Sequence, residues 1–406
     1  MRTNPEILKS LIKEGSLVPQ EEMLEVARKK AKLQIGIPKE ISFQERRVAL
    51  VPEAVSLLVA NGHEVLIESK SGEHAYFSDT EYSEAGAEIC YDRKEIFQCD
   101  LIFKVAPPSE DEVELMKGNQ TLISALQLSV QPKVILQKLM QKKVTAIAWD
   151  YMQDEEGVYS VVRSMGELAG TTSILIAGEL LSSFHSGKGL MFGGVTGVQP
   201  TEVVVIGAGT VAEYAVQAAT GLGASVKVFD NSLTRLRRLQ SNIGKRIFTS
   251  VIQPKVLAKA IRRADVVIGA LRAPLGRTPC VVTEKMVSDM KAGSVIVDVS
   301  IDQGGCFETS RIMNHNNPTF VKHDVIHYCV PNIASRVSRT ASFTISNIFS
   351  PILLEMGGQG GCGDLIKNDP GFRSGVYIYR GTLTSEVLGK VFNLKYKDID
   401  LLVLGM

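Results

Sequence analysis

Short apolar runs alternate along the chain with segments in which apolar residues recur at every third or fourth position. The runs are typical of strands buried on both faces of a parallel sheet, and the recurrence is typical of helices. The pattern predicts strands at 33–37, 63–69, 101–105, 121–126, 144–149, 203–206, 246–249, 265–269, 294–299 and 319–321. It predicts helices at 5–31, 52–61, 167–183, 233–241 and 338–355. This alternation predicts an α/β protein with a doubly wound parallel sheet.

The strand predicted at 203–206 runs into a glycine turn of the form G-x-G-x-x-A. Gly207 can adopt a tight turn, Gly209 lets the backbone approach a pyrophosphate, and the small Ala212 lets a helix pack close to the sheet. The N-terminus of that helix offers free N–H groups to phosphates. Asp230 closes the next strand and can accept hydrogen bonds from ribose hydroxyls. The motif predicts a dinucleotide site, with a purely structural turn as the alternative.

Length and composition narrow the choice of function. A chain of 406 residues suggests two or three domains, and 45% hydrophobic with 22% charged residues is typical of a globular protein. The net charge of +1 gives no electrostatic reason to expect a nucleic acid or a membrane as partner. We expect no transmembrane segment and no signal peptide. Six cysteines without a C-x-x-C pair indicate a reducing, cytoplasmic setting.

Several further segments resemble those of alanine dehydrogenases, in the alanine dehydrogenase/transhydrogenase superfamily. The matching segments are GIPKE at 36–40, RRVAL at 46–50, GHEVLIES at 62–69, GGVTGV at 193–198, VVVIGAG at 203–209, ADVVIGA at 264–270, DVSIDQGGCFE at 298–308 and HYCVPN at 327–332. The resemblance covers about 33 to 400. It implies NAD as cofactor, L-alanine oxidation to pyruvate and ammonia as reaction, and a homo-oligomer, commonly a hexamer, with a dimer also open.

The resemblance also implies two Rossmann-like domains that flank a cleft. Residues 33–164 would form the first part of a substrate domain, 165–336 the NAD-binding domain, and 337–406 the second part of the substrate domain. Residues 1–32 precede the resemblance, and their apolar spacing predicts a helical extension. The expected cofactor-binding residues are Gly207, Ala208, Gly209, Thr210, Val211, Asp230, Arg235, Leu271, Ile301 and Asn332. Asp230 would repel a 2′-phosphate, which favours NAD, although Arg237 and Arg238 leave NADP open.

Oxidation of an amino acid needs a cation for the substrate carboxylate and a group that moves protons. By the resemblance, Arg47 holds the carboxylate, because a guanidinium offers a planar, always-charged fork. Asp302 would face the nicotinamide and the substrate, at the carboxyl edge of the sheet. The alternatives are two solvated arginines, Arg46 and Arg47, and an Asp302 that merely forms a turn.

Two positions depart from the family pattern. The family's substrate-binding lysine corresponds to Ala106, and its catalytic histidine corresponds to Gln127, which cannot exchange a proton near neutral pH. Lys104, one pleat away on the same strand face, is a candidate replacement. General acid–base help is worth about 10²- to 10⁴-fold in rate, so the loss of both groups predicts slow turnover of alanine.

These departures leave two alternatives to an alanine dehydrogenase. One is a dehydrogenase of the same family for another amino or oxo acid. The other is a non-catalytic NAD(H)-binding subunit that resembles the nucleotide domain of a transhydrogenase. We expect no metal site, although His323 and His327 have the spacing of helical metal ligands. The glycine-rich segment 357–363 is expected to be a flexible loop.

Overall fold

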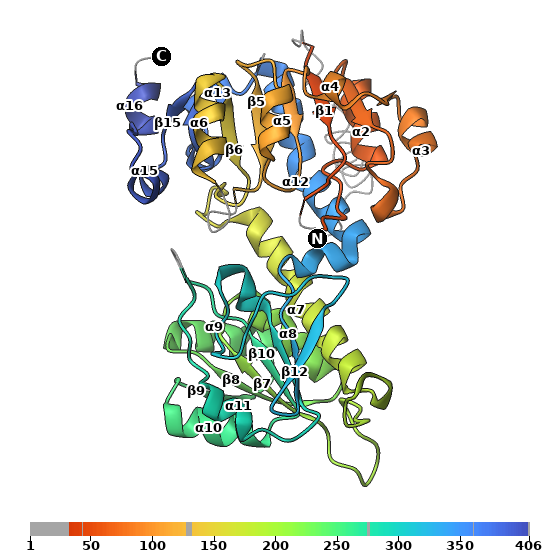
Figure 1. The fold of residues 1–406 in the computed structure, drawn as a ribbon, viewed down its shortest axis with the longest axis vertical. Helices are drawn as coiled ribbons and strands as arrows, with labels where there is room; N and C mark the ends of the chain where they lie inside the picture. Colours follow the sequence, from red (N-terminus) through yellow and green to blue (C-terminus); the bar gives the residue numbers. More distant parts are fainter. Residues whose placement is uncertain (1–31, 43, 127–131, 274–276, 360, 405–406) are drawn as a thin grey trace, which may run out of the picture.

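The computed structural model describes residues 32–42, 44–126, 132–273, 277–359 and 361–404. Two sheets form two lobes, one above the other in Figure 1. Two long helices, α7 (Ser160–Leu181) and α12 (Ser338–Gln359), run between the lobes (Figure 1). The helix predicted at 5–31 and the candidate residue Gln127 lie outside the described residues.

The upper sheet has eight strands and takes its last two from the C-terminal part of the chain. In spatial order they are β15 (Thr382–Leu383), β14 (Val376–Tyr379), β6 (Thr145–Ala148), β5 (Thr121–Ser124), β4 (Leu101–Phe103), β1 (Gln34–Ile37), β2 (Glu64–Glu68) and β3 (Glu88–Cys90). The strands from β6 to β3 are parallel, whereas β14 pairs antiparallel with β6 and β15 pairs antiparallel with β14. The parallel strands therefore have the doubly wound order of a Rossmann fold.

The lower sheet has seven strands with the same doubly wound order. They are β12 (Thr319–Lys322), β13 (Val325–Tyr328), β11 (Val295–Asp298), β10 (Val266–Gly269), β7 (Glu202–Ile206), β8 (Ser225–Phe229) and β9 (Phe248–Ser250). Only the edge strand β12 pairs antiparallel. The central strands β7, β10 and β11 are buried on both faces, as their apolar runs predict. The predicted α/β fold class is confirmed.

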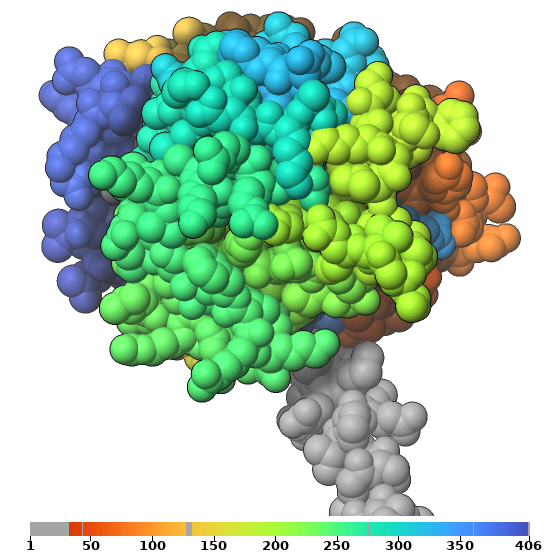
Figure 2. All heavy atoms as spheres, turned by 90° about the horizontal axis from the view of Figure 1, so that it is seen from below, coloured from red at the N-terminus to blue at the C-terminus, as the bar shows by residue number. Residues whose placement is uncertain are grey.

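The remaining helices pack on the two sheets and along their edges. Around the upper sheet lie α2 (Pro52–Ala60), η1 (Glu73–Ala75), α3 (Asp79–Glu84), α4 (Arg93–Ile96), α5 (Glu110–Leu115), α6 (Lys133–Gln141), α13 (Gly363–Asn368), α14 (Pro370–Ser374), α15 (Glu386–Phe392) and α16 (Ile399–Val403). Around the lower sheet lie η2 (Ser183–His185), α8 (Thr210–Gly221), α9 (Leu233–Ile243), α10 (Pro254–Arg263), α11 (Glu284–Ser288), η3 (Val299–Gln303) and η4 (Ile333–Val337). Figure 2 views the molecule from below, with the green residues of the lower lobe in front.

The prediction of a flexible loop at 357–363 is wrong, because Gly357 and Gly358 continue α12 and Gly363 begins α13. A Cβ atom at Gly357 would lie 2.1 Å from the ring of His63, so a glycine is needed where this helix packs against His63. Glycine thus allows a close approach at this position. None of the helices in the described ranges is long and apolar enough to cross a membrane.

Candidate active site

The glycine turn after β7 leaves room for a phosphate group. Gly207 has φ +120°, and a Cβ there would lie 2.4 Å from the carbonyl oxygen of Ala270, so the position requires glycine. At Gly209, by contrast, an added Cβ would meet no heavy atom within 4 Å. Gly209 caps the N-terminus of α8 without a side-chain hydrogen bond, so N–H groups of the first turn face this open space. These residues fit the pyrophosphate of a dinucleotide.

Asp230 is buried and braces the same turn. Its Oδ2 accepts a hydrogen bond from the N–H of Ala208 at 2.8 Å, and its Oδ1 accepts one from the N–H of Ser232 at 2.7 Å. The N–H of Ala208 is therefore engaged by Asp230. Arg235 lies exposed on the first turn of α9, on the outer side of this strand end.

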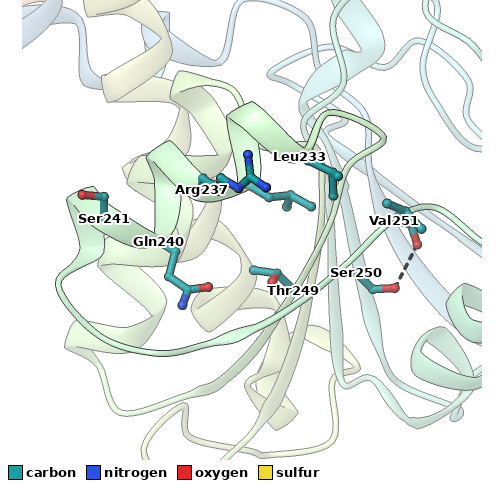
Figure 3. A pocket seen from close by; sticks show the side chains of 8 residues that line it. Leu233, Arg237, Gln240, Ser241, Thr249, Ser250 and Val251 are labelled. Atoms are coloured by element: carbon teal, nitrogen blue, oxygen red, sulfur yellow. Dashed lines mark hydrogen bonds between the residues drawn. The ribbon is translucent and has the colours of Figure 1, made fainter.

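An open hollow of about 580 Å³ lies between α9 and β9 (Figure 3). It is lined by Leu233, Leu236, Arg237, Gln240, Ser241, Thr249, Ser250 and Val251. The hollow adjoins the strand end that carries Asp230, which is where the adenosine half of a dinucleotide lies in Rossmann folds. Its lining combines leucine side chains, polar groups and the cation Arg237, which suits the apolar ring and polar edges of an adenosine group.

The turn that carries Asp302 is held by Asp298, the last residue of β11. The Asp298 carboxylate accepts hydrogen bonds from the N–H groups of Ser300 and Cys306, both at 3.0 Å, and from the hydroxyl of Ser310 at 2.6 Å. Burial raises the pKa of Asp298 to about 6, although these hydrogen bonds oppose the change. The neighbouring Ile301 is buried, and the N–H of Leu271 donates to the hydroxyl of Ser300 at 3.0 Å.

Arg47 is only 4% exposed and faces a buried carboxylate from its own loop. Its Nε and Nη2 atoms donate to the two oxygens of Glu45, each at 2.7 Å, which makes a bidentate ion pair. Burial raises the pKa of Glu45, but the charge and hydrogen bonds of Arg47 outweigh burial and the pKa is lowered. Nη1 lies 3.2 Å from the sulfur of Met165. Arg47 is thus no solvated surface charge, unlike the exposed Arg46.

Asn332 connects this loop of the upper lobe to the lower lobe. Its Oδ1 accepts a hydrogen bond from Nη2 of Arg47 at 2.7 Å, and its Nδ2 donates to Glu45 at 2.6 Å. Its backbone N–H donates to Asp302 at 3.0 Å. Burial raises the pKa of Asp302, opposed in part by the Asn332 hydrogen bond and by the charge of Arg47, although one side of the residue remains exposed. The structure thus brings Arg47, Asp302 and Asn332 together.

Lys104 lies outside this network, in a second buried cluster. Its Nζ donates to Glu112 at 2.8 Å and to the carbonyl of Pro107 at 3.2 Å, and it lies 3.4 Å from Glu40. Burial lowers the pKa of Lys104, but the two carboxylates outweigh burial and the pKa is raised. Lys104 is fully buried, so a substrate would have to displace these partners to reach it.

Glu40 lies beside the position where the family pattern has its lysine. Its Oε1 accepts hydrogen bonds from the N–H groups of Val105 at 2.5 Å and of Ala106 at 3.3 Å. Burial raises the pKa of Glu40 to about 7, against the opposing charge of Lys104. Ala106 itself is buried, and its methyl group brings no charge to the position where the family pattern has a lysine.

Sequence reasoning missed Glu40 and Glu45 as members of the site. Both lie inside the segments that carry the family resemblance, and Glu45 stands two positions before Arg47. The sequence did offer a signal for Glu45: a buried arginine needs an anionic partner, and Glu45 is a carboxylate close to Arg47 in the chain. The two histidines have separate partners: His323 pairs with Glu284, and His327 binds the hydroxyl of Thr309 and the carbonyl of Val325. The described residues hold no group of three His, Cys, Asp or Glu side chains suited to a metal ion.

Comparisons with known proteins find relatives along most of the chain. Residues 36–169 match the sequence profile "Alanine dehydrogenase/PNT, N-terminal domain", and residues 173–386 match "Alanine dehydrogenase/PNT, C-terminal domain". The chain is 39% identical over 368 residues to the alanine dehydrogenase of Mycolicibacterium smegmatis, which covers 90% of this chain and 98% of that protein. It is also 39% identical to the alanine dehydrogenase of Methanococcus maripaludis, over 89% of this chain and 97% of that protein.

Solved structures show the same fold. An L-alanine dehydrogenase superposes with a TM-score of 0.84 at 34% identity, covering 89% of this chain and 99% of that chain. A transhydrogenase from Sinorhizobium meliloti superposes with a TM-score of 0.73 at 24% identity, covering 87% of this chain and 99% of that chain. The second likeness concerns the fold alone.

Proposed function

The chain belongs to the alanine dehydrogenase/PNT family of oxidoreductases, and we propose that it is an NAD(H)-dependent dehydrogenase that interconverts an amino acid and its 2-oxo acid. L-Alanine and pyruvate are the first pair to test. The observation that carries the proposal is the network of Arg47, Asn332 and Asp302, which joins segments of the two lobes beside the glycine turn.

For the cofactor, we propose that Gly207, Gly209 and the first turn of α8 hold the pyrophosphate. The hollow beside α9 would receive the adenosine half, and Asn332 and Leu271 would border the nicotinamide half. The bound nicotinamide would accept or return a hydride at the substrate carbon. Two backbone N–H groups fix the Asp230 carboxylate at the end of β8, where it would repel a 2′-phosphate, so NAD rather than NADP is the expected dinucleotide.

On the substrate side, Arg47 would bind the carboxylate through Nη1, because Glu45 and Asn332 already occupy the Nε and Nη2 edge. Asp302 would hold or release the proton that moves on the substrate nitrogen or on water. Its raised pKa brings it closer to the range in which a carboxyl group can exchange protons at neutral pH. Ala106 and Gln127 supply no such group, so turnover would depend on Asp302.

One experiment separates this proposal from the non-catalytic alternative. NADH binding and NADH consumption with pyruvate and ammonium are measured on the same sample. Tight binding with turnover that disappears in Asp302→Ala supports the dehydrogenase. Tight binding without turnover on pyruvate or on larger 2-oxo acids would favour an NAD(H)-binding subunit. The double substitution Ala106→Lys with Gln127→His is expected to raise turnover of pyruvate, and no gain would indicate a site shaped for another substrate.

We also propose that copies of this chain assemble, as a hexamer or, alternatively, a dimer. Support comes from large apolar side chains that lie exposed on α7 and on the segment after it. They are Leu175, Phe184, Met191, Val195 and Val198. Light scattering coupled to size-exclusion chromatography gives the mass directly. A monomer at micromolar concentration would contradict the proposal.

A further inference from the structure

Arg272 lies at the carboxyl edge of the lower sheet, next to Asp302. Strands β10 and β11 are parallel neighbours with Gly269 opposite Asp298. Arg272 comes three positions after Gly269 and Asp302 four positions after Asp298, so both leave the same edge of the sheet side by side. Both residues are exposed, although the strands before them are buried.

The backbone on each side of Arg272 is fixed to the turn that carries Asp302. The N–H of Leu271 donates to Ser300 at 3.0 Å, and the N–H of Ala273 donates to the side-chain oxygen of Gln303 at 3.0 Å. The side-chain nitrogen of Gln303 returns a hydrogen bond to the carbonyl of Ala273 at 3.3 Å. The backbone of Arg272 is therefore held in a defined place relative to Asp302.

The charge of Arg272 also acts on a side chain of the upper lobe. Tyr151 follows β6, the parallel neighbour of β5, and thus lies at the carboxyl edge of the upper sheet. Burial raises the pKa of the Asp302 carboxyl and of the Tyr151 phenol, and the positive charge of Arg272 opposes both changes. Asp302, beside Arg272, binds Asn332, and Asn332 binds Arg47 of the upper lobe, so Arg272 lies at the junction between the two lobes.

Two other cations, Arg47 and Lys104, are already bound to partners within the protein. Arg47 gives two of its nitrogens to Glu45 and Asn332, and Lys104 is enclosed by Glu40 and Glu112. Within the described ranges, no carboxylate forms an ion pair with Arg272. The charge of Arg272 acts on the nearby Asp302 without a direct ion pair, so its N–H donors remain available to a substrate carboxylate that enters the junction.

We propose that Arg272 is a specificity-determining residue that supplies the second cation for the substrate carboxylate, opposite Arg47 and in place of the charge that Ala106 lacks. The proposal rests on the proposed function in one respect, the 2-oxo acid as substrate. The cation would come from the nucleotide-binding lobe, so a 2-oxo acid would be held between the two lobes. Two arginines suit a carboxylate well, since each can donate charge-assisted hydrogen bonds.

The same guanidinium could instead bind the cofactor pyrophosphate, because Leu271 lies beside Gly207. Both sources present an anionic oxygen group, and separate binding measurements distinguish them. The variants are Arg272→Gln, which removes the charge, and Arg272→Lys, which keeps it. Arg262→Gln is the matched control, since Arg262 lies exposed at the end of α10, away from the turn that carries Asp302.

NADH affinity is measured by fluorescence titration, and pyruvate affinity by calorimetry on the NADH-saturated protein without ammonium. In Arg272→Gln we expect a change of less than about twofold in the NADH Kd and an increase of about 10- to 100-fold in the pyruvate Kd, the loss of one charge-assisted contact. Arg272→Lys should recover part of the affinity, and Arg262→Gln should equal the wild type. With ammonium, KM for pyruvate should rise while kcat changes much less.

Two results would overturn the proposal: an unchanged pyruvate Kd in Arg272→Gln, or a weaker NADH Kd with no separate effect on pyruvate. If the wild type binds pyruvate through Arg272 but does not turn it over, the proposed activity fails and the Arg272 site stands. If the wild-type NADH complex binds neither pyruvate, 2-oxobutyrate nor 2-oxoglutarate, the Arg272 site is rejected. If both KM for pyruvate and kcat are unchanged in Arg272→Gln, the activity stands and the Arg272 site is rejected.

Discussion

The guanidinium of Arg47 and the side-chain oxygen of Asn332 meet at 2.7 Å although 285 positions separate them in the chain. Arg47 belongs to the loop after β1, whereas Asn332 follows β13 of the other sheet. Asn332 also donates its backbone N–H to Asp302. Arg47, expected to bind the substrate, and Asp302, expected to exchange protons, are therefore both hydrogen-bonded to Asn332. Their relative position therefore depends on Asn332.

Substitution of Asn332 by Asp should weaken this junction. Asn332 has φ +59°, a left-handed conformation that Asp tolerates about as well as Asn, so the backbone should remain unchanged. The new carboxylate would replace the N–H group that donates to Glu45 and repel it. We expect the free energy of unfolding to fall by about 2 kcal/mol in urea denaturation. Asn393→Asp, at an exposed left-handed position, should have little effect, and equal losses would argue against a special role of Asn332.

Two glycines of the same turn should respond differently to alanine. Gly209→Ala adds a methyl group where no protein atom lies within 4 Å, so folding should be normal and NADH binding should weaken by about tenfold or more. Gly207→Ala forces a side chain onto the Ala270 carbonyl at φ +120°, so the melting temperature itself should fall. Thermal unfolding and NADH fluorescence separate the two effects. Unchanged NADH affinity in Gly209→Ala would mean that no pyrophosphate lies at this turn.

The strands that hold the site were predictable, because each is a continuous apolar run that a parallel sheet buries on both faces. The run at 203–206 is such a case: it forms the last four residues of β7, and every side chain in it is buried. The glycine turn was predictable for a related reason. Gly207 is required by a backbone conformation, and that requirement is local to the turn.

The contacts of the site were harder to predict, because they join segments that are distant in sequence. Nothing near Asn332 signals that its side chain binds Arg47 and Glu45, since irregular loops have no periodicity from which a direction can be inferred. Similarly, β14 pairs with β6 across more than two hundred positions, and its four residues alone do not select that partner. Arg272 lies in a loop, and no sequence motif marks it as a candidate functional residue.

Lys104 should prove important for stability rather than for turnover. Lys104→Met leaves the buried carboxylate of Glu40 without its cation and leaves Glu112 with Arg93 alone. Breaking a buried ion pair on one side costs about 3 kcal/mol or more. The control is Lys117→Met, because Lys117 forms an exposed pair with Asp100 and should contribute less than about 1 kcal/mol. Urea denaturation measures both. A stable Lys104→Met protein with strongly reduced kcat would instead assign Lys104 to the reaction.

His327 should make the protein less stable in mild acid. Its ring is fully buried, with Nδ1 at 3.0 Å from the carbonyl of Val325 and Nε2 at 2.9 Å from the hydroxyl of Thr309. Burial lowers the pKa of His327 to about 4, whereas an unfolded histidine has a pKa of about 6.5.

Above pH 6.5 the imidazole is neutral in both states, and its contribution to stability is fully present. As the pH falls towards 4, His327 becomes protonated in the unfolded chain but stays neutral in the native protein. The free energy of unfolding therefore drops by up to about 3 kcal/mol. In His327→Gln this part of the pH dependence should disappear, whereas the exposed His74→Gln should retain it. Urea denaturation at several pH values between 4 and 7 measures the slopes. Equal slopes in the wild type and in His327→Gln would show that His327 is protonated without cost in the native protein.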